Sequence, residues 1–577
     1  MRLGAWGLGL KRPRLILLIL AVVLVTTAVL LAVSGGFRTT VGGFRISARS
    51  PLAGSVAALI AGAAWFALAR RERASAADLE AAWNALERHS TRIIGAIALI
   101  AAIVAATFAT RSAAGADASG YLSQAQLWSG GAWVFANPLA DILERGDPWL
   151  TTPLGWRPAG PSYHVPTYPP GLPLLMSIPH AIAGIGGAHA VAIASAAAAV
   201  WATGMLAGGV AGVIAAILLA VSPVFLYQSF QPMSDVPVTA AWLVCLLMIT
   251  GGDKPSGWSS ALAGIACALA ILIRPNLAPL AIVPFFVTRH RIGFAVPVVV
   301  AGSFLAIMQW LWYGSPLQSG YGSVEELFSF ANMAPNAIRY MNWLIATAPV
   351  LLLAPFGFLR VRGDRYARGL AIFALLVLAA YLVYGVFDHW SYLRFLLPAL
   401  AAFAIFAATD LNARINRWPL AWRAPILLGL VLGTVAHSLS LARSLETFKL
   451  AGQLRRVEQV ADFIKQQLPR EAVMISGEQS GSMRYYTGLP ILRWEAATDE
   501  TLSKAVATLE TANRPVYIVL DAWENEPFVG KFKDVPAVAL DWPPMVDAGT
   551  SHRTRLWKLA DRARFLAGEN LHTVRLP

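Results

Sequence analysis

The sequence predicts an α-helical polytopic membrane protein with about 13 transmembrane helices and a small soluble α/β domain at the C-terminus. Of its 577 residues, 57% are hydrophobic and only 14% are charged, and the mean hydropathy is +0.57. Soluble globular domains carry about 25% charged residues. The apolar residues are also gathered in long runs that stop near residue 445, where helix-like and strand-like patterns begin to alternate.

The apolar runs have the lengths of membrane spans, although some are short for a hydrocarbon core of about 30 Å. They fall near 14–34, 51–69, 94–110, 187–208, 209–229, 236–251, 258–273, 276–288, 292–313, 343–361, 370–387, 395–409 and 424–444. The first run is longer than the apolar core of a cleaved signal peptide, so we expect a retained helix. The segment 171–186 contains prolines and is expected to be a re-entrant or interfacial helix. Counting it as a span would invert every later loop.

The charge distribution predicts how the chain is oriented. Residues 1–445 contain 29 Lys and Arg against 15 Asp and Glu, whereas residues 446–577 contain 17 of each. With the N-terminus in the cytoplasm, alternation of the spans places 19 of those 29 basic residues on the cytoplasmic side, as the positive-inside rule requires. The C-terminal domain is then periplasmic, and the protein belongs in a bacterial cytoplasmic (inner) membrane. Basic residues in so apolar a chain indicate membrane orientation, and no nucleic-acid partner is expected.

Three domains follow from these patterns: residues 1–93 form two extra N-terminal transmembrane helices and a basic cytoplasmic loop, 94–445 form the transmembrane core with a long outer loop at 111–170, and 446–577 form the periplasmic domain. In the last domain, AVMISG and VYIVLD have the pattern of short buried strands between helical segments. It has no phosphate-binding glycine motif, so we expect a lid or scaffold. Acceptor recognition by Trp494, Tyr485 and Tyr486 is the alternative.

Several ionisable side chains come to the outer ends of the predicted helices. They are Asp117, Asp235, Arg274, Asp388, His389 and Arg394. Ionisable groups near membrane depth usually face a water-filled cavity or one another. They therefore either surround one cavity, or reach interfacial water and form structural ion pairs such as Asp388 with Arg394. Cys245 and Cys267 lie inside apolar runs, and neither a disulfide framework nor a zinc site is expected from them.

A series of motifs follows the same outer face. GADASGYLSQA at 115–125 contains Asp117 with Tyr121 four residues later, and the outer loop ends in YHVPTYPPGLPLL. SDVP, RPN, WYGSPLQSGYG and SYLRFLLPAL then follow. In this order, over residues 94–410, the chain resembles the GT-C superfamily of membrane glycosyltransferases. It is most similar to the branch that contains protein O-mannosyltransferases and lipid A aminoarabinose transferases.

The resemblance implies an enzyme that moves a sugar from a polyprenyl-phosphate carrier to an acceptor hydroxyl at the outer face of the membrane. It also implies that Asp117 is the catalytic base. The sequence differs from the family at Ala118, where a second acidic residue often follows. It differs again at 167–170, where Thr-Tyr-Pro-Pro replaces a Glu-Lys pair of the aminoarabinose branch. Both differences bear on the divalent metal and on the identity of the sugar.

The chemistry of such a transfer gives the same residues a role. A carboxylate can take the proton of an acceptor hydroxyl, so Asp117 and Asp235 are the predicted catalytic residues. Guanidinium groups match phosphate oxygens, so Arg274 and Arg394 are predicted to bind the departing lipid phosphate. Asp235 has two further interpretations, which are orienting the acceptor and holding Arg274.

Three other side chains, Tyr121, Tyr168 and His389, complete the predicted substrate-binding set. His389 and His164 lie at no recognised metal-ligand spacing, so a divalent cofactor is not supported, although hard-cation binding stays open. The expected partners are the lipid-linked sugar donor, membrane lipids and a lipid, glycan or protein acceptor.

Two other classes of function fit an apolar chain of this kind. A flippase of a lipid-linked sugar would show inverted repeats with broken helices in matching halves, and the sequence shows no such symmetry. A non-catalytic membrane scaffold would not require Asp117 or Arg274 for any activity. Release of polyprenyl phosphate from a lipid-linked sugar distinguishes the three.

Overall fold

The long apolar runs form membrane-spanning helices in the computed structural model, which describes residues 12–34, 37–41, 44–48, 51–250 and 257–577. Eight helices among these residues are long and apolar enough to cross a membrane. They are α1 (Arg12–Ser34), α2 (Pro51–Arg71), α3 (Ser75–Phe108), α5 (Gly171–Ala207), α11 (Arg291–Tyr313), α15 (Arg365–Leu382), α16 (Leu397–Ile415, preceded by η5 Trp390–Leu396) and α17 (Leu420–Ser444).

The remaining predicted spans are bent or short. Two helix pairs are broken: α6 (Gly209–Ala220) meets α7 (Pro223–Ser229) at 65°, and the segment containing α13 (Met333–Thr347) meets the one formed by η4 (Pro349–Leu353) and α14 (Ala354–Val361) at 111°. Both second members begin with proline, which cannot donate the hydrogen bond that would continue the preceding helix. Three shorter apolar segments are α8 (Asp235–Thr250), α9 (Gly257–Ile273) and η2 with α10 (Pro275–Ala281, Ile282–Val287). Each predicted run thus has its helical counterpart, and the prediction of a multi-pass helical membrane protein is confirmed.

The ambiguous segment 171–186 forms the first part of α5. The helix is interrupted at Ala183 and Gly184, where φ and ψ leave the helical region. A Cβ atom on Gly187 would lie 1.9 Å from the carbonyl oxygen of Pro179, eight residues earlier. In a straight helix these positions are about 12 Å apart, so the first part of α5 folds back on the second. That the segment is re-entrant or interfacial stays a prediction.

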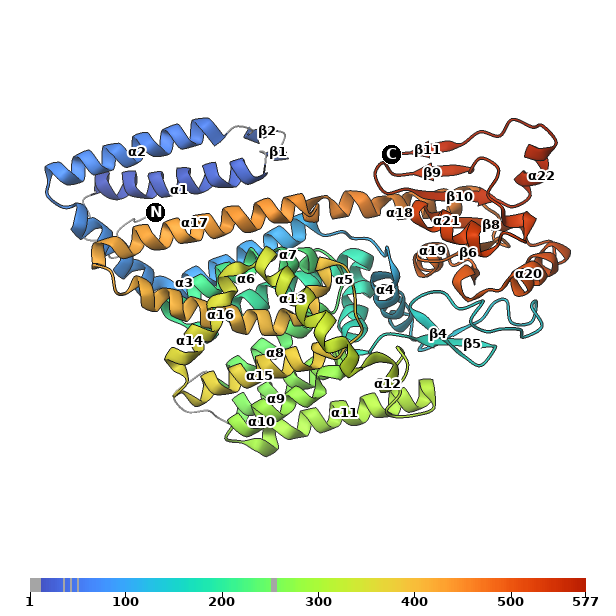
Figure 1. The fold of residues 1–577 in the computed structure, drawn as a ribbon, viewed down its shortest axis with the longest axis horizontal. Helices are drawn as coiled ribbons and strands as arrows, with labels where there is room; N and C mark the ends of the chain where they lie inside the picture. Colours follow the sequence, from blue (N-terminus) through green and yellow to red (C-terminus); the bar gives the residue numbers. More distant parts are fainter. Residues whose placement is uncertain (1–11, 35–36, 42–43, 49–50, 251–256) are drawn as a thin grey trace.

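Basic loops that the charge pattern places on one side are joined by ion pairs. Asp410 of α16 is buried and accepts hydrogen bonds from Arg360 of α14 at 2.6 Å and Arg414 at 2.5 Å. At the N-terminus, Arg14 lies 3.2 Å from the buried Asp78 of α3. Helices α1 and α2 form a hairpin beside α17, and the short strands β1 (Phe37–Val41) and β2 (Phe44–Ala48) pair at its far end (Figure 1).

The outer loop 111–170 is structured. It begins with helix α4 (Ala116–Ser129) and continues into a three-stranded antiparallel sheet in the order β3 (Phe135–Ala136), β5 (Tyr163–Pro166), β4 (Trp156–Ala159). Helix α4 packs against α5 on one side and against α19 (Ser480–Thr487) of the C-terminal domain on another. The loop therefore lies between the membrane helices and the C-terminal domain (Figure 1).

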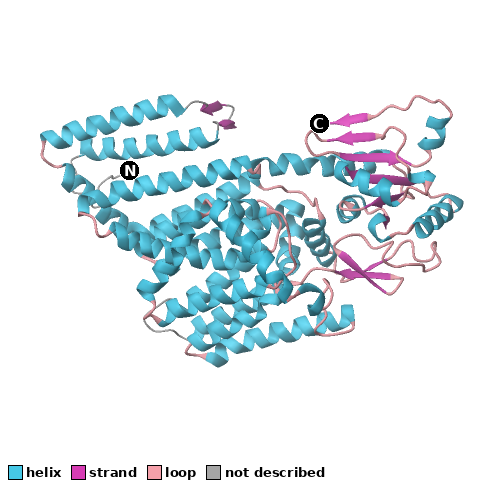
Figure 2. Cartoon of the chain, in the orientation of Figure 1, coloured by secondary structure: helices cyan, strands magenta, loops and turns pink. Residues whose placement is uncertain are grey.

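The C-terminal domain is a layered α/β unit built on one mixed sheet. The strand order is β11 (Val574–Leu576), β9 (Val546–Ala548), β10 (Thr554–Lys558), β8 (Val516–Asp521), β6 (Val473–Ser476), β7 (Ile491–Arg493). Successive residues of β8 alternate between two apolar clusters, one shared with α18 (Leu450–Gln467) and the other with α20 (Asp499–Thr511). The helices thus cover both faces of the sheet. This is the predicted domain, and its strands gather at one end of the molecule (Figure 2).

Three short helices complete the fold: α12 (Val324–Leu327), α21 (Asn525–Lys531) and α22 (Asp561–Leu566). Helix α17 joins the membrane helices to the C-terminal domain, and α18 continues from it in nearly the same direction (Figure 1). It also docks on the outer loop, because the hydroxyl of Tyr486 accepts a hydrogen bond from the backbone N–H of Ala113 at 2.8 Å and the hydroxyl of Ser480 accepts one from Leu154 at 3.1 Å.

Candidate active site

Asp117 lies in the first turn of α4, where the chain leaves α3 and enters the outer loop. Its side chain is 34% exposed. One carboxylate oxygen accepts a hydrogen bond from the Tyr168 hydroxyl at 2.9 Å, and the other accepts one from Arg394 Nη2 at 2.9 Å. The carboxylate is therefore held in one orientation from two sides while keeping contact with open space.

Asp235 is the first residue of α8 and has no exposed side-chain surface. Arg274 Nη2 donates to Asp235 Oδ1 at 2.5 Å, and Arg394 Nε lies 3.9 Å from the same oxygen. Asp117, Arg394, Asp235 and Arg274 thus form a row of alternating charge. Each of the two guanidinium groups faces a carboxylate, so neither of their positive charges is left uncompensated.

A tyrosine that the sequence analysis did not identify as a site residue hydrogen bonds to Arg274. The hydroxyl of Tyr381 in α15 accepts hydrogen bonds from Arg274 Nη1 at 3.0 Å and from Asn276 Nδ2 at 3.2 Å. The hydroxyl of Ser234 accepts from Arg274 Nε at 3.2 Å. Tyr381 lies inside an apolar run as long as a membrane span. Only its hydroxyl could have indicated a site residue, and tyrosine hydroxyls are common in membrane helices.

These residues open into one large cavity of about 860 Å³. One wall is polar and includes Asp117, Tyr168, Arg274 and Arg394. Helix α11 contributes a mainly apolar part of the lining through Gly302, Leu305, Ala306, Met308, Gln309, Trp312 and Tyr313. Pockets of this size with a few convergent polar groups on apolar walls suit a ligand that has a charged head and an apolar chain.

The cavity contains most of the predicted site residues. Tyr121 lines it and packs its ring 4.6 Å from that of Tyr168. Asp235 does not line it, although its neighbour Ser234 does, so the structure favours holding the arginines over touching the acceptor. His389 is exposed, lies outside the lining and hydrogen bonds to Ser391 Oγ at 2.7 Å. The structure gives no support to its predicted contact with substrate.

The structural ion pair considered for Asp388 and Arg394 does not form. Asp388 is exposed and accepts a hydrogen bond from Arg339 Nε at 2.6 Å, whereas Arg394 is directed to Asp117 and stacks 5.0 Å from the Tyr392 ring. Five residues separate Asp388 from Arg394 in sequence, and Arg394 lies inside the 3₁₀ turn η5 whereas Asp388 precedes it.

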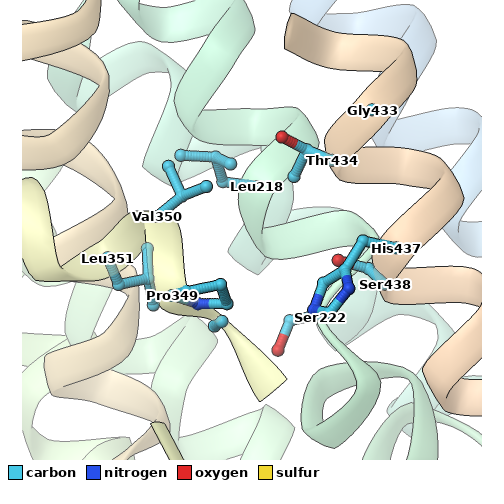
Figure 3. Close-up of a pocket in the computed structure, with 10 residues that line it drawn as sticks. Leu218, Ser222, Pro349, Val350, Leu351, Gly433, Thr434, His437 and Ser438 are labelled. Atoms are coloured by element: carbon cyan, nitrogen blue, oxygen red, sulfur yellow. The ribbon is translucent and has the colours of Figure 1, made fainter. Parts of the chain in front are cut away.

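A second pocket of about 200 Å³ lies where both bent helix pairs break, beside α17 (Figure 3). It is lined by Leu218, Ser222, Ala348, Pro349, Val350, Leu351, Gly433, Thr434, His437 and Ser438. It has no carboxylate or guanidinium among these residues, and its one ionisable side chain is that of His437.

The sequence analysis found no metal-ligand spacing for His389 and His164. Among the residues that the structure describes, no three His, Cys, Asp or Glu side chains lie together as a metal site. His164 is buried in β5 with its Nδ1 3.1 Å from Thr152 Oγ1, and burial together with the charge of Arg484 lowers its pKa to about 4. The neutral His164 ring is therefore a structural part of the three-stranded sheet in the outer loop.

The arrangement of the membrane helices, the outer loop and the C-terminal domain has a counterpart among solved structures. In particular, the fold is similar to that of ArnT from Cupriavidus metallidurans, a structure bound to undecaprenyl phosphate. The similarity has a TM-score of 0.51 at 14% identity and covers 81% of this chain and 97% of that one.

A second solved structure that resembles the chain is the oligosaccharyltransferase of Archaeoglobus fulgidus in complex with zinc and sulfate. Its TM-score is 0.44 at 15% identity, with 76% of this chain and 70% of that chain covered. No protein-family model matches the chain, and no curated protein sequence matches it. The similarity is thus one of fold, and the residues of the cavity carry the functional argument.

Proposed function

We propose that the protein is a glycosyltransferase that moves a sugar from a polyprenyl-phosphate carrier to an acceptor hydroxyl at the outer face of a bacterial inner membrane. The observation that carries the proposal is the position of Asp117. Its carboxylate lines a cavity that also presents two guanidinium groups and a long apolar wall.

The donor matches the two walls of the cavity. Its phosphate would lie against Arg274 and Arg394, whose donors suit phosphate oxygens. Its isoprenoid chain would lie along α11, where seven cavity-lining residues present mainly apolar surface. The crystal structure of ArnT from Cupriavidus metallidurans bound to undecaprenyl phosphate supports this class of donor, because the two chains share a fold.

The transfer needs one base. The acceptor oxygen attacks the anomeric carbon, its proton passes to Asp117, and the bond between that carbon and the phosphate oxygen breaks with its electron pair leaving on the phosphate. A single displacement inverts the anomeric centre. The leaving phosphate needs little protonation, and the guanidinium groups stabilise its charge. General base catalysis of this kind contributes typically about 10²–10⁴-fold.

Binding of the donor would also prepare the base. Arg394 donates to Asp117 at 2.9 Å in the described structure, and a bound phosphate competes for the same guanidinium. A carboxylate that loses part of this interaction accepts a proton more readily. Asp235 would keep Arg394 and Arg274 in place during the exchange, which is a positioning role.

The decisive variant is Asp117→Asn, assayed by release of polyprenyl phosphate from a labelled lipid-linked sugar. We expect normal expression and a loss of turnover of at least about 100-fold, since the amide cannot take the proton. Asp388→Asn is the matched control, because Asp388 is an exposed outer carboxylate outside the cavity lining. Near-normal turnover of the Asp117 variant would contradict the assignment. A flippase would leave the sugar–phosphate bond intact in the wild-type protein.

A further inference from the structure

The helix that carries Asp117 has no cap of its own. The residue before α4 is Gly115, whose φ is +81° and which has no side chain to accept the free N–H groups of the first turn. The C-terminal domain supplies the acceptors instead. Glu478 Oε1 lies 3.5 Å from the position that a Cβ atom on Gly115 would take, beside the start of α4, and Gln479 Oε1 accepts a hydrogen bond from the backbone N–H of Gly115 at 3.3 Å.

The loop that holds Glu478, between β6 and α19, is braced by a buried network. The backbone N–H of Glu478 donates to Glu524 Oε1 at 3.0 Å, and Gln479 Nε2 donates to Asp521 Oδ2 at 2.9 Å. A Cβ atom on Gly477 would lie 2.1 Å from Glu524 Oε1, so the loop has no room to shift toward it. The capping carboxylate is therefore presented from a fixed position.

The contact surface around the cap is equally close. A Cβ atom on Gly481 of α19 would lie 2.6 Å from the Ser119 hydroxyl of α4 and 2.5 Å from the Leu154 carbonyl oxygen. Only a residue without a side chain permits this approach. Helices α4 and α19 thus meet with little freedom for the first turn of α4 to move by itself.

We propose that Glu478 is a positioning residue of the site, which caps α4 from the C-terminal domain and thereby fixes the helical turn that presents Asp117 to the cavity. The proposal rests on the function proposed for Asp117. It makes the C-terminal domain part of the catalytic unit, beyond a lid or a scaffold. A cap that comes from another domain couples docking of that domain to the geometry of the base.

The charges around Glu478 give the cap a pH dependence. Burial raises the pKa of the Glu478 carboxyl to about 7, the Ala116 N–H opposes this rise, and the carboxylates of Glu524, Asp521 and Asp117 add to it. A carboxyl whose pKa is higher in the docked state favours docking when protonated. This contribution is fully present below about pH 4.5 and is lost as the pH rises through about 7. Tyr168 and Tyr392 also lie within range of its charge.

Hydrogen exchange of the full-length protein tests the cap without reference to activity. For peptides that cover Ala113–Ser129, Glu478→Ala should raise exchange at the start of α4 about fivefold, the usual effect of losing a cap. Glu478→Gln keeps an acceptor oxygen and should retain protection. Glu471→Ala is the matched control, because this exposed glutamate precedes the same strand. Unchanged exchange in Glu478→Ala overturns the proposal.

The pH series of the conservative variant gives a second readout that stays valid if Glu478→Ala fails to fold. After correction for intrinsic rates, protection of α4 in the wild-type protein should fall from about pH 5 to about pH 8, while Glu478→Gln should show no such fall. Equal pH dependence in both proteins overturns the proposal. In the polyprenyl phosphate assay, Glu478→Ala should lower kcat at unchanged donor KM, and Glu478→Gln should restore it. If exchange behaves as expected but the wild-type protein releases no polyprenyl phosphate, the cap stands and the enzyme proposal fails.

Discussion

At the residue scale, one buried carboxylate organises the cavity. Asp235 faces both Arg274 and Arg394, and its second oxygen has no hydrogen-bond partner among the described residues. The two arginines of the polar wall thus pair with a carboxylate that does not itself line the cavity. The sequence analysis identified Asp235 and both arginines from the SDVP, RPN and SYLRF motifs. It could not predict which of them pair, because the pairs join residues up to 159 positions apart.

The variant Asp235→Asn tests that pairing. It leaves two buried guanidinium groups without their shared anion, and breaking one side of a buried ion pair costs about 3–5 kcal/mol. We expect a lower melting temperature in detergent and a raised KM for the lipid-linked donor, while Asp388→Asn changes neither. A variant that melts normally and keeps the donor KM would show that Tyr381 and Ser234 suffice to hold Arg274, and that Asp117 suffices to hold Arg394.

At the element scale, α4 lies close to the loop that follows it. A Cβ atom on Gly120 would lie 2.0 Å from the Tyr168 ring, and one on Gly155 would lie 2.6 Å from the Gly120 Cα atom. This close approach lets the Tyr168 hydroxyl reach Asp117. The sequence showed a glycine in a helical pattern but not its neighbour, since the contact crosses the 111–170 loop.

The variant Gly120→Ala should therefore push Tyr168 away from Asp117. Overpacking of this kind costs about 1–3 kcal/mol, and we expect a lower melting temperature together with at least a tenfold loss of turnover (about 1.4 kcal/mol). Gly130→Ala is the control at the end of the same helix, where the nearest atom lies at an ordinary 3.4 Å. Equal turnover in the two variants would show that the packing of Gly120 against Tyr168 does not affect catalysis.

Helix lengths were easier to predict than helix shapes. Each apolar run has a helical counterpart, because burial in hydrocarbon requires consecutive apolar residues. Of the about 13 predicted spans, eight described helices are long and apolar enough to cross a membrane, or ten if each bent pair is one span. The kinks at Ala183 and Gly184, the 65° and 111° bends and the small sheet of the outer loop depend on packing between distant segments. The strands β6 and β8, whose residues are all buried, were predicted from their apolar runs, whereas β7, β9, β10 and β11 contain partly exposed residues and were missed.

At the scale of the whole molecule, the two sets of loops lie at different ends of the helices. The basic residues Arg14, Arg360 and Arg414 pair with carboxylates at helix ends that the charge rule places inside. The cavity and the C-terminal domain belong to the loops placed outside. Which of the two ends faces outside stays a prediction, and a direct measurement can establish it.

A phosphatase reporter gives that measurement. Fused after Pro577 it should be active, since the enzyme folds only on the periplasmic side, and inserted at Gly363 between α14 and α15 it should be inactive. The pair controls for expression, because both fusions carry the same chain. The reverse result would place the cavity on the cytoplasmic face and contradict transfer at the outer leaflet.

By itself, the sequence determined the spans, their expected orientation, the α/β character of the tail and a short set of polar residues, since each depends on local composition or periodicity. Only the tertiary structure decided that Arg394 binds Asp117 across 277 positions, that Asp235 lies outside the cavity lining and that Gln479 of the C-terminal domain accepts a hydrogen bond at the start of α4. Such contacts form when distant segments pack, and packing leaves no periodic signal in either segment.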